Sequence, residues 1–352
     1  MGKLAVYKYF SFLCLIATVI LAGFTIFGLF GGNVSPAGNN ALAMLVYALP
    51  VVIIADLVML LYWLIRRRWH WIVIPVIALL CSIPYVGTLV QFRSEPVGVD
   101  AKSGLKIATY NVAMFNRETT GFVAQDILTT MKKHKVDVLC LQEYSWVSGD
   151  MNNTENYKEY FQYAVKGYDD MMIFSRYPIT RSETIPFEQT SNSAMWADID
   201  VHGREFRIVN VHLQTTGINS VLHQANKRAN QGIEQDNQSW LTRMLYGRYT
   251  TGMMVRAHQA EKMAEIMKDS PHPIILCGDF NDVPYSYVYK TMKGELVDGF
   301  KECGSGWMYT FRGKKSVRID YIFHDKSLEG LTYYKHELTY SDHYPVFMKI
   351  AL

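Results

Sequence analysis

The chain has 352 residues, 49% of them hydrophobic, and a formal net charge of +3 at pH 7. Five Lys and Arg residues and a single Asp lie before residue 72, so that region carries +4 and the rest of the chain carries −1. The near-neutral remainder lacks the broad basic surface expected of a protein that holds long nucleic acid by its phosphates. Five cysteines without a C-x-x-C pattern indicate neither a disulfide framework nor a zinc site.

Three apolar stretches near the N-terminus are each long enough to cross a membrane as a helix. They cover roughly residues 9–30, 42–65 and 72–92. The first could instead be a cleaved signal peptide, but two further spans favour a true anchor. We therefore predict a membrane region at 1–92 with three transmembrane helices and a lipid bilayer as partner. Asp56, in the second span, is costly in lipid and should face another helix or water.

The basic residues predict how these spans are oriented. Lys3 and Lys8 precede the first span and 66–68 (RRR) follow the second, whereas the loop between these two spans carries no charge. The positive-inside rule puts both basic groups in the cytoplasm. We therefore predict a multi-pass protein of the plasma (inner) membrane. Residues after 92 would be extracytoplasmic, which means periplasmic in a cell with two membranes.

After a predicted linker at 93–103, short strand-like runs alternate with turns over residues 104–352. Apolar residues at helical spacing predict helices at 121–135 and 252–268. Strands are predicted at 105–112, 136–143, 170–175, 194–201, 205–213, 273–280, 318–323 and 345–351. Many strands with a few interspersed helices favour two packed sheets flanked by helices.

An insertion at about 214–256 interrupts this order. It holds five basic residues and two acidic ones. Two interpretations remain open: a solvated helical excursion, or a lid or membrane-facing element that selects substrate.

Polar residues recur where apolar strand runs end. They are Asn111, Glu143, His212, Asp279, Asn281, Asp320, Asp342 and His343. Each alone has an ordinary explanation, as a solvated strand end, a surface histidine or an Asx turn. Several strand ends at one sheet edge converge, so the set as a whole predicts one polar site.

The ordered motifs "LQE", "GDFN", "RIDYIF" and "SDH" resemble those of the endonuclease/exonuclease/phosphatase superfamily, over about residues 104–352. That superfamily includes pancreatic-type deoxyribonucleases, apurinic endonucleases, inositol polyphosphate 5-phosphatases and neutral sphingomyelinases. The resemblance implies an α/β fold, a four-layer α/β sandwich of two mostly antiparallel sheets flanked by helices. It also implies that activity depends on Mg²⁺ or Mn²⁺.

The resemblance implies a metal site of hard oxygen ligands, which Mg²⁺ prefers. Glu143 would be the principal ligand, Asp342 would contribute, and Asn111 would orient the set. Whether one or two ions bind stays open.

The resemblance also implies catalytic roles. His343 would contact the scissile phosphate or transfer a proton, held by Asp320. Asp279 would position or deprotonate the attacking water, and Asn281 would donate to a phosphoryl oxygen. His212 would stabilise the phosphate or the leaving group. Whether Asp279 or His343 is the general base stays open.

We therefore predict an enzyme, a membrane-anchored Mg²⁺- or Mn²⁺-dependent hydrolase of phosphoester bonds. A lipid headgroup or a small phosphodiester is favoured as substrate, because an anchor raises the local concentration of lipid and the domain is near neutral. One alternative is an extracytoplasmic nuclease acting on DNA or RNA, so nucleic acid is a less favoured partner. A second is a non-catalytic membrane receptor or scaffold with the same fold. No protein partner is indicated.

Overall fold

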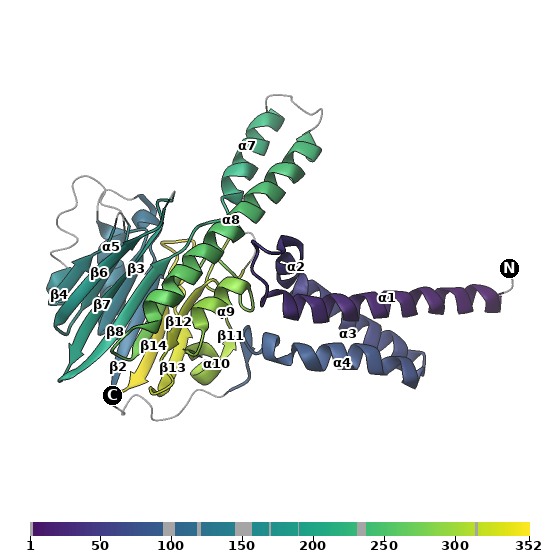
Figure 1. Ribbon diagram of the computed structural model, residues 1–352, viewed down its shortest axis with the longest axis horizontal. Helices are drawn as coiled ribbons and strands as arrows, with labels where there is room; N and C mark the ends of the chain where they lie inside the picture. Colours follow the sequence, from purple (N-terminus) through teal and green to yellow (C-terminus); the bar gives the residue numbers. More distant parts are fainter. Residues whose placement is uncertain are drawn as a thin grey trace. The chain divides into compact units, whose positions relative to one another are not determined.

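The structure is a computed structural model, shown in Figure 1. It describes residues 3–93, 103–117, 121–144, 157–168, 170–188, 190–230, 237–313 and 316–352. The chain forms two compact units: Met1–Thr88 with Pro284–Lys290, and Leu89–Val283 with Thr291–Leu352. Most of the predicted linker, residues 94–102, lies outside the described residues.

The first unit contains the apolar helices. They are α1 (Lys3–Gly31), α2 (Asn40–Met44), the 3-10 turn η1 (Leu45–Ala48), α3 (Leu49–Ile65) and α4 (Trp69–Val86). Three segments are long and apolar enough to cross a membrane: Val6–Gly31, Asn40–Ile65 and Trp69–Val86. The third ends earlier than the predicted 72–92, because the chain turns after Val86 and pairs as strand β1 at Val90–Gln91.

Polar contacts join α1 to α3 inside this unit. Asp56 is fully buried, and Thr25 Oγ1 donates to its Oδ2 at 2.5 Å. About two helical turns further along, Trp63 Nε1 donates to Thr18 Oγ1 at 2.9 Å. Asp56 therefore faces another helix, as its cost in lipid predicts.

The second unit is built on two six-stranded sheets among the described residues. One has the order β10-β12-β9-β8-β7-β6, with strands Val297–Asp298, Asp320–His324, Ile274–Asp279, Arg204–His212, Ser193–Val201 and Ile179–Pro186. The other has the order β13-β14-β2-β3-β5-β4, with strands Gly330–Lys335, Val346–Ala351, Gly104–Asn111, Val138–Gln142, Met172–Ser175 and Tyr163–Lys166. A small ribbon pairs β1 with β11 (Gly306–Trp307).

Each sheet contains one parallel pair, β2 with β3 and β8 with β9, and its other pairs are antiparallel. Parallel neighbours need a crossover connection, which is usually helical. The turn η3 (Ala113–Arg117) and α5 (Phe122–Lys133) supply the first crossover. The second is supplied by α7 (Ile218–Asn230) and α8 (Asn237–Lys268). Short helices α9 (Tyr287–Lys293) and α10 (Gly299–Cys303) follow β9 and β10.

The core has two layers of apolar packing. Inner-facing residues of both sheets form one cluster, and residues of α5 with the outer faces of β2, β3 and β5 form another. Figure 1 shows α5 and α8 against opposite faces of the stacked sheets. Two mostly antiparallel sheets between helices confirm the predicted four-layer sandwich.

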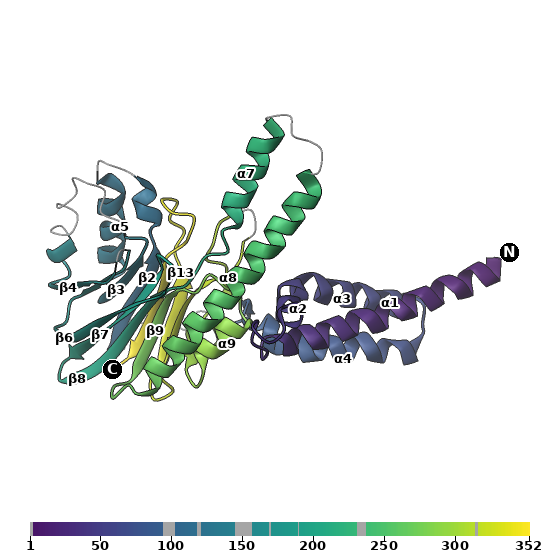
Figure 2. The ribbon, with the colours of Figure 1, turned by 45° about the horizontal axis from the view of Figure 1, so that its top comes forward.

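The helix α8 differs most from prediction. Its C-terminal part covers the predicted helix 252–268, and Met253, Ala257, Ala260 and Met267 on its predicted apolar face are buried. The helix nevertheless begins at Asn237, 15 residues before the predicted start, and with α7 it forms a hairpin that projects from the sheets (Figures 1 and 2).

Candidate active site

Successive side chains along a strand point to opposite faces of the sheet, and this alternation places polar residues in the space between the two sheets. In β2, Ile107 belongs to the core between the sheets and Asn111 lies four positions further on the same face. In β9, Cys277 belongs to that core and Asp279 follows two positions later. The inner faces are thus apolar along the strands and polar at one end.

Strand register brings these ends together. In the first sheet Asp279 is paired with His212 on the parallel strand β8 and with Asp320 on the antiparallel strand β12. In the second sheet Asn111 is paired with Gln142, the last residue of β3, so Glu143 follows directly at the same edge. The ends of five strands, β2, β3, β8, β9 and β12, therefore meet at one place.

Gly278, in the "GDFN" motif, is required by the close approach of two strands. Its φ is +132°, and a Cβ there would lie 2.0 Å from the carbonyl oxygen of Val211 on β8. Only glycine fits such a backbone without displacing the neighbouring strand. The position fixes β9 against β8, and with it Asp279 beside His212.

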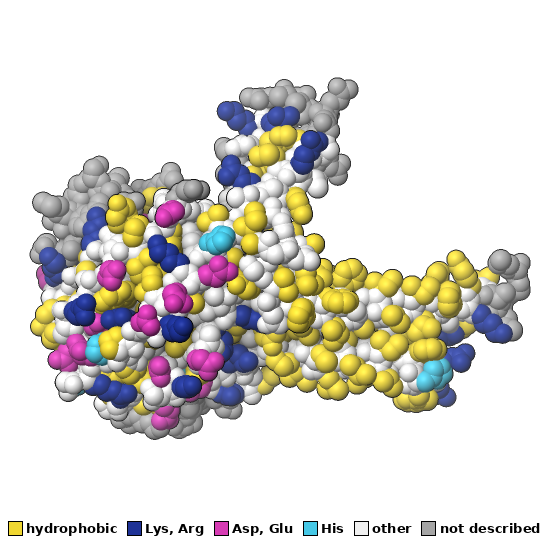
Figure 3. Space-filling view, in the orientation of Figure 1, with side chains coloured by type: hydrophobic (Ala, Val, Ile, Leu, Met, Phe, Trp, Pro, Cys, Tyr) yellow, Lys and Arg dark blue, Asp and Glu magenta, His cyan; other side chains and the backbone are white. Residues whose placement is uncertain are grey.

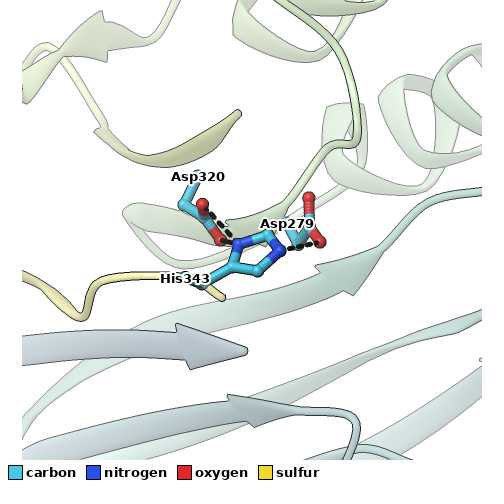
Figure 4. Close-up of side chains that lie close together, drawn as sticks. All are labelled: Asp279, Asp320 and His343. Atoms are coloured by element: carbon cyan, nitrogen blue, oxygen red, sulfur yellow. Dashed lines mark hydrogen bonds and ion pairs between the residues drawn. The ribbon is translucent and has the colours of Figure 1, made fainter. Parts of the chain in front are cut away.

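His343 lies between two carboxylates (Figure 4). Its Nδ1 donates to Asp320 Oδ2 at 2.9 Å, and its Nε2 lies 3.7 Å from Asp279 Oδ2. Its backbone N–H donates to Ser341 Oγ, whose hydroxyl donates to the carbonyl of Asn111. Burial opposes the charged imidazolium, but the carboxylates of Asp320 and Asp279 outweigh it and raise the pKa of His343 to about 10.

Asp279 is almost fully buried and receives several hydrogen bonds. The backbone N–H of Asn281 donates to its Oδ1 at 2.8 Å, and Nδ2 of Asn111 donates to its Oδ2 at 3.1 Å. Burial raises the pKa of Asp279 to about 6, even though His343 stabilises its charged form. Its carboxylate is therefore ionised at neutral pH but able to take a proton.

Glu143 is the more open carboxylate of the site. It follows β3 with a φ of +52°, an uncommon conformation for a residue other than glycine, and its side chain is 35% exposed. Nδ2 of Asn111 donates to Glu143 Oε1 at 3.0 Å as well as to Asp279. Asn111 thus holds both carboxylates in place.

His212 is oriented by a residue that the sequence analysis did not assign. Its Nδ1 and Asp170 Oδ2 are 2.6 Å apart, while its Nε2 lies 3.8 Å from Glu143 Oε1 and 3.9 Å from Asp279 Oδ2. Burial alone would lower the pKa of His212, but the hydrogen bond that it donates to Asp170 and the nearby carboxylates raise it. No motif marks Asp170, because it lies in a turn before β5 and meets His212 only in the fold.

The remaining two predicted residues have simpler surroundings. Nδ2 of Asn281 donates to the carbonyl of Leu213 at 2.9 Å and to Asp279 Oδ2 at 3.3 Å, so this amide braces the site. Asp342 is exposed, next to His343, and Ser341 Oγ lies 3.5 Å from its Oδ1.

A polar layer below the site was also not predicted. The side chains of Gln142 and Asn210 are buried, and Nε2 of Gln142 donates to Oδ1 of Asn210 at 2.6 Å. Nδ2 of Asn210 donates in turn to the carbonyls of Leu141 and Met172 in the opposite sheet. These bonds tie the two sheets together directly beneath the converging strand ends.

Comparison with known proteins decides the family. The sequence model described as "Endonuclease/Exonuclease/phosphatase family" matches residues 108–343. The chain belongs to this family. The match confirms the resemblance read from the motifs, and with it the predicted class of a hydrolase acting on phosphoester bonds. A second model, a domain of unknown function, matches residues 10–89.

Individual relatives of this family member are distant. An exodeoxyribonuclease of Bacillus subtilis (strain 168) is 24% identical over 158 residues, which are 44% of this chain and 51% of the relative. The chain therefore spans about half the length of that curated relative. An endonuclease/exonuclease/phosphatase from Bacteroides vulgatus has a TM-score of 0.51 at 17% identity, covering 71% of this chain and 100% of its own. TDP2 of D. rerio complexed with a single-strand DNA product has a TM-score of 0.50 at 18% identity, with the same two coverages.

The charges of the site fit the divalent cation on which the family depends. Five carboxylates gather around two histidines: Glu143, Asp170, Asp279, Asp320 and Asp342. Within the described residues, the ion pairs of these carboxylates are all with His212 or His343 and none is with Lys or Arg. Even with both imidazoles protonated, negative charge is in excess, which a bound cation would offset.

The three residues that lie close enough to share an ion among the described groups are Asp279, Asp320 and His343. In this group the charged His343 already donates to Asp320, and an imidazolium is no metal ligand. The carboxylate of Glu143 is more open than these three groups, and its ion-pair partner among the described residues is His212, whose Nε2 lies 3.8 Å from its Oε1.

Proposed function

We propose that this chain is a membrane-anchored, Mg²⁺- or Mn²⁺-dependent phosphoester hydrolase whose catalytic site is the cluster around His343. The observation that carries the proposal is the bridging of Asp320 and Asp279 by His343 beside the open carboxylate of Glu143. A carboxylate base, a charged acid and excess negative charge for a cation are what attack of water on a phosphoester requires.

The protonation state of each catalytic group would determine its role. Asp279, ionised at neutral pH, would take a proton from the attacking water as its oxygen bonds to phosphorus. His343, protonated and held by Asp320, would hydrogen-bond to the phosphoryl group and give a proton to the leaving oxygen as the P–O bond breaks. His212, held by its contact with Asp170, would stabilise the growing negative charge.

Glu143 would hold the divalent ion, with Asn111 orienting it and Asp342 contributing. When bound, the ion would neutralise charge on the phosphoryl oxygens.

A lipid headgroup or a small phosphodiester is the substrate that we favour. Two features of the chain support it: the residues after the apolar region carry a net charge of −1, and three helices are apolar enough to cross a membrane. The anchor would hold the site near lipid, and in the proposed orientation the site would be extracytoplasmic.

A nuclease is the second candidate. It is favoured by the similarity to an exodeoxyribonuclease and by the fold shared with TDP2, which is complexed with a single-strand DNA product. The near-neutral second unit disfavours long nucleic acid, because phosphate contacts by Lys and Arg supply most of its affinity.

The proposal is tested with the full chain in nanodiscs and bis-p-nitrophenyl phosphate as substrate. Hydrolysis should require Mg²⁺ or Mn²⁺, stop with EDTA and fall by about 10²-fold or more in Asp279→Asn. Asp269→Asn, a change at an exposed position after α8, is the matched control and should hydrolyse normally. Metal-independent hydrolysis would overturn the mechanism, and no hydrolysis of any phosphoester would favour the receptor or scaffold.

The substrate class is decided by a panel of phospholipid liposomes against plasmid DNA and single-stranded DNA. Faster release of headgroup phosphoester than of nucleotides supports the lipid assignment, and the reverse order makes the protein a nuclease.

A further inference from the structure

Helix α7 and the first part of α8, up to Thr250, form a hairpin that we call the arm. The two helices contact each other, and in two views they project away from the stacked sheets (Figures 1 and 2). Along α8, buried side chains become regular only from Thr250 onward, where the helix reaches the body of the unit. The crossover from β8 to β9 needs only this second part, so the arm is additional to what the fold requires.

The described side chains of the arm are basic where they are charged. Lys227, Arg228, Arg243 and Arg248 lie on it, and residues 218–230 and 237–250 contain no Asp or Glu. The connecting residues 231–236 include one Glu and one Asp in sequence, so the arm keeps an excess of two positive charges. Figure 3 shows Lys and Arg side chains gathered on the arm, whereas acidic and basic side chains alternate on the visible face of the sheets.

Aromatic side chains accompany these charges. Tyr246 is 55% exposed, between the exposed Arg243 and Arg248 on α8. The guanidinium of Arg228 on α7 lies 4.6 Å from the ring centre of Trp240 on α8, and this contact joins the two helices. Exposed tyrosine and partly exposed tryptophan among Lys and Arg are typical of segments that lie in the headgroup region of a bilayer.

The base of the arm is fixed to the catalytic loops. Arg256 of α8 is fully buried; its Nε donates to Asp282 Oδ2 at 3.2 Å and its Nη1 to the carbonyl of Gln214 at 3.0 Å. Oε1 of Gln259 accepts from the N–H of Gln214 at 2.8 Å. Asp282 is three residues after Asp279, and Gln214 is two after His212. An object bound to the arm is thereby held at a defined place relative to the site.

We propose that the α7–α8 arm binds the surface of an anionic phospholipid bilayer and holds it beside the catalytic site. Charge complementarity and the exposed aromatic residue carry the proposal, together with the three membrane-spanning candidates in the same chain. A bilayer fits better than nucleic acid, because three exposed cations on one arm of a near-neutral unit make a small footprint for a polyanion. The proposal does not depend on the substrate of the site.

Hydrogen–deuterium exchange of the full chain tests it. The protein is placed in nanodiscs of phosphatidylcholine, with or without phosphatidylglycerol, and anionic vesicles are added to a sample in the neutral discs. With anionic lipid, either in the disc or in added vesicles, amides of residues 239–250 should exchange at least about fivefold more slowly than in neutral discs alone. A factor of this size corresponds to the attraction of a single basic residue to the anionic surface. The protection should disappear in high salt.

Two triple variants make the test specific. Lys227→Glu, Arg243→Glu and Arg248→Glu together should abolish the protection. The matched control replaces three exposed lysines at the end of α5, Lys132, Lys133 and Lys135, by Glu and should keep it.

Equal exchange rates in neutral and anionic lipid would overturn the proposal. Protection by single-stranded DNA that exceeds protection by anionic lipid would also overturn it and assign the arm to nucleic acid. Loss of exchange protection across the sheets of the triple variant would show unfolding. The salt dependence of the unmodified chain then decides.

Discussion

Asp170 and His212 share a hydrogen bond of 2.6 Å across 42 residues of sequence. Since the Nδ1 of His212 is engaged by a carboxylate, its Nε2 is directed at the Glu143 and Asp279 side of the site, 3.8 and 3.9 Å away. The bond orients the imidazole and, against the lowering effect of burial, helps to raise the pKa of His212. It makes Asp170 a positioning residue for His212.

Asp170→Asn should therefore lower kcat by about 10- to 100-fold, the range seen when a partner that orients a functional histidine is removed. KM should change little, because Asp170 itself does not contact the substrate. Steady-state kinetics on bis-p-nitrophenyl phosphate measure the two constants separately. In a protein that already carries His212→Gln, adding Asp170→Asn should lower kcat little further. Two independent, additive losses would contradict the positioning role.

Glu143→Gln should weaken the binding of Mn²⁺ by about tenfold or more, because a neutral amide replaces the open, charged oxygen ligand. Binding is measured by the electron paramagnetic resonance of free Mn²⁺, so the result does not depend on activity. Glu188→Gln, at an exposed position of the same unit, is the matched control. Unchanged Mn²⁺ affinity in the Glu143 variant would move the metal site elsewhere.

The rate should depend on pH through Asp279 and His343. Asp279 must be ionised to accept a proton, and burial raises its pKa to about 6, so kcat/KM should fall as the pH drops through that value. His343 must be protonated to donate, and its two carboxylates raise its pKa to about 10, so kcat/KM should fall again above that value. A pH–rate profile shows both limbs.

His343→Gln should slow the reaction and abolish the alkaline limb, since glutamine does not titrate. An alkaline limb that persists in this variant would assign that limb to another group.

The sequence reveals the site better than it reveals the elements around it. Strands such as β2 and β9 are predictable, because their apolar alternation is strong and ends in a polar residue. β6 is not, because it carries exposed polar side chains and a terminal Pro186 that give no apolar pattern. The N-terminal part of α8 is also not predictable from the sequence, since Gly247 and Gly252 are poor helix formers that interrupt the helical spacing of apolar residues.

Contacts between distant segments are what the sequence could not supply. Asp170 lies in a turn before β5 without any motif, and only the fold brings it to His212. The inner positions of Gln142 and Asn210 interrupt apolar alternation, but nothing in either strand says that the two side chains meet across the sheets.

Gly278→Ala should destabilise the protein more than Gly203→Ala. Both glycines have positive φ, so each substitution incurs backbone strain of about 1–3 kcal/mol. At Gly203 a new Cβ meets nothing within 4 Å, whereas at Gly278 it would lie 2.0 Å from the carbonyl oxygen of Val211. Thermal unfolding followed by circular dichroism compares the two. Equal melting temperatures would contradict the close approach of β8 and β9.

The last prediction concerns the side of the membrane on which the second unit lies. Basic residues lie before the first span, at Lys3 and Lys8, and after the second, at 66–68 (RRR). The loop between these two spans carries none. Lys and Arg in short segments resist translocation, whereas a large domain can be carried across. Alkaline phosphatase fused after Leu352 should therefore be active, and green fluorescent protein fused there should stay dark after export through the general secretory route. The opposite pattern would place the site in the cytoplasm and make an intracellular nucleotide or nucleic acid the better candidate substrate.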